Sequence, residues 1–146
     1  MQVYADNAAT TKMSATAISA MTAYFEQNYG NPSSLHSMGQ EAKEALDAAR
    51  ETVAKNLNAD AREIYFTSGG SEADNQAILT AAELGRRKNK LHIISTAFEH
   101  HAVLHTLQKL EKQGFEVTLL DVSQGHNITA QQVKDAIRDE IGRAHV

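Results

Sequence analysis

Strand-like runs alternate with helical patterns from residue 63 to about residue 139, and this order constrains the fold most. The strand-like runs cover 63–68, 91–96 and 116–122, and the helical patterns cover 71–87, 101–113 and about 130–139. Such an alternation is typical of an α/β protein, in which helices connect neighbouring parallel strands. We therefore expect a mostly parallel sheet of about three strands.

Two amphipathic helices are predicted before this alternation. Ser14 is a candidate cap for a helix that ends before Gly30, and a second helix follows Pro32-Ser33-Ser34. The sequence has one proline and no repeat or low-complexity segment, so no interdomain linker is visible. We expect a single α/β unit over residues 1–146, built as a partial three-layer sandwich.

Composition excludes several classes of function. The 146 residues suit one domain, with 42% hydrophobic residues and a formal net charge of −4. The basic run Arg86-Arg87-Lys88 is interpreted as a solvated helix end, with a phosphate-backbone patch as the alternative, so no nucleic-acid partner is expected. Without an export signal or a long apolar run, we expect a cytoplasmic protein with no membrane partner.

A small-residue turn at residues 66–75 could hold a phosphate. Gly69 and Gly70 allow close approach to the main chain, and Ser71 is a candidate N-cap with a hydroxyl donor at the start of a helix. Glu72 and Asp74 suit the helix dipole, but they would repel a dianion unless their side chains point away. The alternative interpretation is an ordinary connection between a strand and a helix.

The kind of phosphate is narrowed by motifs that the sequence lacks. No Walker run of Gly-x-x-x-x-Gly-Lys-Ser/Thr occurs, and the adjacent Gly69 and Gly70 do not form a dinucleotide fingerprint of three spaced glycines. A single phosphate monoester is therefore the expected anion.

His100 is the second residue predicted to carry chemistry, because it follows a strand end, where ligands of open α/β sheets gather. The alternative is a helix-start histidine that is bonded to a nearby backbone group. His101 and His105 stand four residues apart and could face one metal ion, but the pair lacks a third ligand. We expect no metal site.

Four ordered motifs give the chain a resemblance to a known family, from about Tyr4 to about Glu140. They are Tyr4-Ala5-Asp6-Asn7-Ala8-Ala9-Thr10-Thr11, Asn31-Pro32-Ser33-Ser34-Leu35-His36, Phe66 to Asn75, and Glu99-His100-His101-Ala102-Val103. The sequence resembles the cysteine desulfurases of the NifS and IscS type, which belong to the class V aminotransferase group of pyridoxal phosphate enzymes. The implied fold is part of the major domain of a pyridoxal phosphate-dependent transferase.

The resemblance implies a reaction, a cofactor and partners. Sulfur would pass from L-cysteine to an enzyme cysteine as a persulfide, leaving L-alanine, for delivery to iron-sulfur cluster assembly or another sulfur acceptor protein. Gly70 and Ser71 would bind the phosphate of pyridoxal 5′-phosphate, and His100 would stack on its ring and move protons. Asn7, Ala8 and Asn31 would lie near the substrate or a partner subunit.

Features that the family's chemistry needs are missing from this sequence. It contains no cysteine, and no lysine stands in the family's Ser-x-His-Lys run, which supplies the covalent anchor of the cofactor. We expect an N-terminal fragment that is inactive by itself. Residues 141–146 do not continue the expected family pattern, so a cloning or frameshift scar is an alternative to native sequence there.

Other functions stay open at this point. Within the enzyme class, the alternatives are a fragment of a selenocysteine lyase or of another class V aminotransferase. Outside it, the alternative is a non-catalytic α/β interaction module. A small parallel sheet with open edges also predicts a homo-oligomer, with a monomer whose N-terminal helices cover the exposed face as the alternative.

Overall fold

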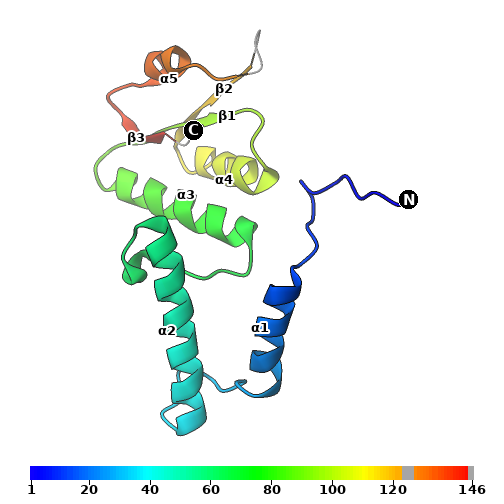
Figure 1. Cartoon of the computed structure of the whole chain (residues 1–146). Helices are drawn as coiled ribbons and strands as arrows, with labels where there is room; N and C mark the ends of the chain where they lie inside the picture. The colour runs from blue at the N-terminus through cyan, green and yellow to red at the C-terminus, as the bar shows by residue number, and fades with distance from the viewer. Residues whose placement is uncertain (123–126, 145–146) are drawn as a thin grey trace. The chain divides into compact units, whose positions relative to one another are not determined.

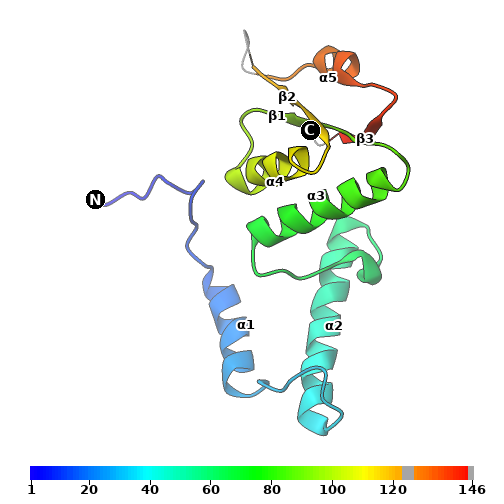
Figure 2. The same ribbon diagram turned by 180° about the vertical axis from the view of Figure 1, so that it is seen from behind.

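The computed structural model describes residues 1–122 and 127–144 (Figures 1 and 2). Tertiary contacts divide the chain into two compact units, Met1–Tyr65 and Phe66–Val146, and each is described by itself. The assignment of residues 1–146 to a single domain therefore stays a prediction. No helix within the described ranges is long and apolar enough to cross a membrane.

The first unit consists of three helical elements joined by capped turns. They are α1 (Ala15–Glu26), α2 (Ser37–Leu57) and the 3-10 helix η1 (Ala61–Glu63). Ser14 accepts a hydrogen bond from the amide of Ala17 at 3.1 Å, which confirms the predicted cap of α1. The cap of α2 is His36, whose Nδ1 accepts from the amide of Gly39 at 3.4 Å.

The loop between α1 and α2 is closed by its own backbone. Asn31 Oδ1 accepts from the amide of Ser33 at 2.9 Å, and its carbonyl accepts from Ser34 at 2.9 Å. A Cβ added at Gly30 or Gly39 would stand 2.2 or 2.4 Å from a backbone oxygen. Glycine is therefore required at both positions by packing.

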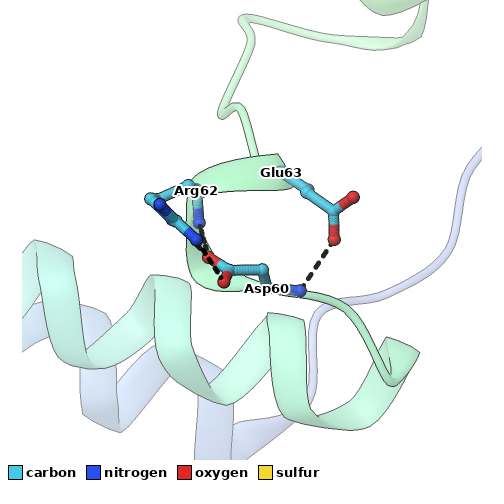
Figure 3. A network of polar contacts seen from close by, with 3 residues as sticks. All are labelled: Asp60, Arg62 and Glu63. Carbon is cyan, nitrogen blue, oxygen red and sulfur yellow. Dashed lines mark hydrogen bonds and ion pairs between the residues drawn. The ribbon is translucent and has the colours of Figure 1, made fainter.

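A capped turn at η1 follows α2 (Figure 3). Asp60 Oδ1 accepts from the amide of Arg62 at 2.8 Å, and Glu63 Oε2 accepts from the amide of Asp60 at 2.8 Å, which completes a capping box. The Arg62 guanidinium, and then its amide, hold the pKa of the Asp60 carboxyl below its ordinary value. These local bonds favour a helical turn where an extended strand was expected to begin.

The second unit is a parallel sheet with helices on both sides (Figure 1). Its strands are β1 (His92–Thr96), β2 (Glu116–Leu120) and β3 (Ile141–Ala144), and its helices are α3 (Gly70–Arg86), α4 (His101–Glu111) and α5 (Ala130–Ala136). The strand order is β2-β1-β3, with both pairs parallel. Helices α3 and α4 lie on one side of the sheet and α5 on the other (Figures 1 and 2). The predicted α/β class and partial three-layer arrangement are confirmed.

The identity of one strand differs from the prediction. β1 and β2 lie where the patterns at 91–96 and 116–122 placed them, but residues 63–68 form no strand. The third strand is β3, which lies in the segment 141–146, whose last two residues are outside the described ranges. In the described residues, β2 and β3 take the two sides of β1, and the segment 63–68 pairs with neither outer edge of the sheet. The carbonyl of Ile64 in this segment accepts from the Arg50 guanidinium instead. The origin of residues 141–146 stays a prediction.

The core of this unit lies between the sheet and the pair α3 and α4. All five residues of β1 are buried, as expected of a central parallel strand. Apolar side chains from both helices meet one face of the sheet, each contributing roughly 1.5–3 kcal/mol when fully buried. The buried cluster comprises Ile78, Ala82, Ile93, Val103, Leu107, Leu110 and Phe115.

Two adjacent buried hydroxyl groups of β1 differ in their pairing, which gives a test of the core. Ser95 Oγ has no partner among the described residues, whereas Thr96 Oγ1 donates to Glu99 Oε1 at 2.8 Å. We expect Ser95→Ala to leave the free energy of unfolding unchanged or to raise it by about 1 kcal/mol, because it removes an uncompensated polar group. Thr96→Val should lower it by about 1 kcal/mol or more. Urea unfolding of the two variants measures these free energies. A larger decrease for Ser95→Ala than for Thr96→Val would contradict the assigned pairing of the two hydroxyl groups.

The imidazole of His92 is buried on the other face of β1. Its Nε2 lies 2.8 Å from Thr118 Oγ1 and 3.3 Å from the Arg138 guanidinium, and its Nδ1 has no partner in the described part of the chain. Burial lowers the pKa of His92, and Arg138 lowers it further, against the opposing effect of Glu116 and Glu140. The neutral ring is therefore the form that the fold stabilises.

This environment predicts an acid-sensitive fold. Below about pH 6.5 the unfolded chain binds a proton at His92 that the folded chain resists. The free energy of unfolding should therefore decrease as the pH decreases. The decrease in the free energy of unfolding between pH 7.5 and pH 5 should be smaller in His92→Gln than in His101→Gln, which changes an exposed histidine and serves as the control. Chemical unfolding at both pH values measures it, and equal losses in the two variants would rule out His92 as the source.

Candidate functional site

The N-terminal end of α3 presents free backbone donors. The helix begins at Gly70, and Gly69 precedes it without a side-chain cap, so the prediction of Ser71 as N-cap is wrong. The first backbone bond at this end runs from the amide of Ala73 to the carbonyl of Gly69 at 3.1 Å. The amides of Gly70, Ser71 and Glu72 have no acceptor among the residues described, as is usual in a first helical turn.

The carboxylate of Glu72 turns back to Ser68, which explains why the helix starts earlier than predicted. Glu72 Oε2 accepts from the hydroxyl of Ser68 at 2.6 Å and from its amide at 2.7 Å. These two bonds, the hydroxyl first, hold the pKa of Glu72 below its ordinary value. An anion at Gly70 and Ser71 would share this helix end with a carboxylate that local donors already stabilise.

Open space adjoins the two glycines of the turn. A Cβ added at Gly69 or Gly70 would meet no atom within 4 Å, in contrast to the glycines of the first unit. Packing within the described chain therefore does not require glycine here. A ligand could approach the main chain at this point, as the phosphate interpretation needs.

His100 caps α4 and keeps one ring nitrogen for other contacts. Its Nδ1 accepts from the amide of Ala102 at 3.1 Å, which confirms the backbone-bonded geometry that was the alternative interpretation. Because Nδ1 accepts, the neutral ring carries its proton on Nε2. This proton is available to a ligand, so the cap and the role implied by the resemblance are compatible.

The N-terminal ends of α3 and α4 meet in one open depression, which we call the α3–α4 depression. It is lined by Ser71, Asn75, His100, His105, Thr106 and Lys109, among others. Two predicted site residues from separate motifs, Ser71 and His100, therefore share one surface, next to Gly70. The depression combines the residue Ser71, which has a free amide and a hydroxyl, with the imidazole of His100, which suits a ligand with an anionic group and a ring.

The α3–α4 depression is also held together by three polar side chains. No role was predicted for these side chains from the sequence. Glu99 is tied to the end of β1 through Thr96, and Asn75 and Thr106 join α3 to α4 at 2.7 Å. The spacing of Asn75 from Ser71 could have indicated its bond within the helix. Nothing in the sequence indicated the bond between helices, because it joins residues 31 positions apart.

His101 and His105 lie on one face of α4, as their spacing predicted. Their rings are 5.3 Å apart and nearly parallel, at 23°. Stacked rings do not converge on a common point, as two ligands of one ion would. In the described chain, no three His, Cys, Asp or Glu side chains gather to hold a metal ion.

The three remaining predicted residues belong to the first unit. The carbonyl of Asn7 accepts from Thr11 Oγ1 at 3.4 Å, and Ala8 lies in the same exposed turn. Asn31 uses its side chain and carbonyl within its own loop. Their proximity to a substrate or partner subunit stays a prediction.

Comparison with known proteins assigns the family. The model of the aminotransferase class-V family matches residues 3–145. The chain belongs to this family. The class-V match includes residues 141–145, which were expected to depart from the family pattern.

Individual relatives of this class-V chain are cysteine desulfurases by name. It is 48% identical over 139 residues to the putative cysteine desulfurase IscS 1 of Bacillus subtilis (strain 168), covering 95% of this chain and 36% of the relative. It is 48% identical over 138 residues to the cysteine desulfurase IscS of Methanosarcina thermophila, covering 94% and 34%. The chain thus spans about a third of the length of these curated relatives.

Solved structures agree with this assignment. DndA from Streptomyces lividans matches with a TM-score of 0.81 and 35% identity, over 95% of this chain and 39% of that one. A structure described as SspA in complex with cysteine matches with a TM-score of 0.82 and 37% identity, over 92% and 38%. The described chain therefore shares its fold with part of each of these two solved structures.

The free amides of α3 predict weak anion binding. A few backbone donors and the hydroxyl of Ser71, each worth on the order of 1 kcal/mol net, should bind inorganic phosphate with a millimolar or weaker dissociation constant. In an amide NMR titration, residues 69–72 should shift first. Chloride at equal ionic strength is the control, and shifts centred elsewhere would refute the site.

Proposed function

We propose that this chain is the N-terminal part of a pyridoxal phosphate-dependent cysteine desulfurase, which takes sulfur from L-cysteine for an acceptor protein. The observation that carries the proposal is the meeting of Ser71 and His100 in the α3–α4 depression. The names of relatives at 48–50% identity support it, and so does a structural neighbour described in complex with cysteine.

The residues present fit pyridoxal 5′-phosphate. The free amides of Gly70 and Ser71, the Ser71 hydroxyl and the open space beside Gly69 suit the phosphate. His100 would lie against the ring, with the proton of Nε2 available for transfer. When bound, the cofactor supplies an electron sink for bond breaking at the substrate's α-carbon.

The groups for covalent chemistry are proposed to lie outside these 146 residues. The sequence contains no cysteine to receive sulfur and no Ser-x-His-Lys run to anchor the cofactor. A cytoplasmic location, a sulfur-acceptor partner and a homo-oligomer belong to the same proposal for the whole enzyme. The names of the relatives favour cysteine desulfurase over selenocysteine lyase, another aminotransferase or a non-catalytic module.

The chain by itself should therefore release no sulfide from L-cysteine beyond a control with cofactor alone. The expectation follows from the missing thiol and anchoring lysine, because both are needed for covalent sulfur transfer. Methylene-blue detection of sulfide with added pyridoxal 5′-phosphate measures this release, and the cysteine desulfurase IscS of Methanosarcina thermophila serves as the positive control. Turnover clearly above the cofactor control would show that the chain supplies these groups in another way.

A further inference from the structure

The side chain of Asn75 forms hydrogen bonds within α3 and across to α4. Its Nδ2 donates to the carbonyl of Ser71 at 2.7 Å and to the carbonyl of Ala102 at 3.4 Å. Its Oδ1 accepts from Thr106 Oγ1 at 2.7 Å. Asparagine is a weak helix former, so these contacts rather than helix propensity account for its place in α3.

The partners of Asn75 fix the orientation of its amide. The carbonyls of Ser71 and Ala102 both lie near one end of the group, and a carbonyl can only accept. That end must therefore be the NH₂ group. Turning the amide over would place Oδ1 against the Ser71 carbonyl, so the cross-helix contact has one stable arrangement.

Thr106 supports this contact from inside the protein. Thr106 is 3% exposed. Its Oγ1 lies 2.8 Å from the carbonyl oxygen of Ala102 and 2.7 Å from Asn75 Oδ1. The single hydroxyl proton of Thr106 is shared between these two acceptors, which lie on either side of a buried oxygen and restrict its movement. The carbonyl of Ala102 is thus the point at which the side chains of both residues meet.

A continuous path of hydrogen bonds joins the two halves of the candidate site. On one side, Asn75 binds the carbonyl of Ser71. On the other, it binds the carbonyl of Ala102, whose own amide donates to Nδ1 of His100 at 3.1 Å. Each step of the path joins groups within the first two turns of α3 or α4.

From this path we infer that Asn75 is a positioning residue, which fixes the spacing between the turn at Gly70 and Ser71 and the ring of His100. The inference rests on the proposed function, because that spacing matters to a ligand with both a phosphate and an aromatic ring. Such a ligand gains from its second contact only when the two binding groups are held in place beforehand.

Two ligands distinguish an effect on the spacing between the turn and the His100 ring from an effect on anion binding at the turn alone. Inorganic phosphate contacts only the turn, whereas pyridoxine 5′-phosphate adds the ring and has no aldehyde that could react with lysines. Amide NMR titrations of the full chain give both dissociation constants, and their ratio measures the advantage of the ring. Asn75→Ala should reduce this ratio roughly two- to tenfold, as expected for one net hydrogen bond, and should leave phosphate binding nearly unchanged.

Asn56→Ala is the matched control. Asn56 Nδ2 donates to the carbonyl of Thr52 at 2.7 Å, the same bond within a helix, with no bond to a second helix among the described residues. Its removal should leave the ratio as in the unmodified chain. Thr106→Val should reduce the ratio as Asn75→Ala does, and Thr106→Ser should restore it. An unchanged ratio in both Asn75→Ala and Thr106→Val would overturn the inference.

A measurement without ligand tests the positioning role of Asn75 separately from the proposed function. If the unmodified chain binds both probes equally, the proposed cofactor site is wrong. Residual dipolar couplings then still report the orientation of α3 relative to α4. In Asn75→Ala, the couplings of the first turns of both helices should change, while those of Asn56→Ala should not. Unchanged couplings in Asn75→Ala would overturn the positioning role.

Discussion

Burial of β1 on both faces and along both edges is the constraint on which the second unit depends. Every residue of this strand is buried, β2 and β3 pair with its two sides, and α3 and α4 cover the face that carries Ile93. Parallel strands have this requirement because their crossover helices lie against the sheet. The carboxyl end of β1 thereby delivers His100 to the same surface as the start of α3.

The sequence predicted where the helices and strands lie better than it predicted which strands pair. Hydrophobic periodicity predicted β1, β2 and the α-helices of the described residues, because it reports which face of an element is buried, although α5 ends at Ala136 and not at about residue 139. It failed at residues 63–68, where an apolar run suggested a strand. Pairing depends on the whole sheet, and residues 63–68 pair neither with β1, which has β2 and β3 at its sides, nor with the outer edges of those strands. A run of apolar residues carries no information on which edge is free.

The candidate site was predictable where its chemistry is local. Glycines before a helix and a histidine after a strand are visible in the sequence, and Ser71 and His100 do share one depression. The role of Ser71 as a cap was wrong because the side chain of Glu72 bonds Ser68 and lets the helix begin at Gly70. The contact between Asn75 and Thr106 depends on how two helices pack, which no spacing within either helix reveals.

The two histidine caps show how folding can prepare a side chain for chemistry. His36 and His100 each accept a helix amide through Nδ1, so each neutral ring carries its proton on Nε2. A cap also fixes the ring relative to the helix axis, because the amide that donates belongs to the first turn. His100 differs from His36 in what adjoins it, since Ser71, whose amide is free at the start of a second helix, lines the same depression. A cap alone is structural, and it is the neighbouring turn, which we propose as the phosphate site, that makes His100 a candidate for proton transfer.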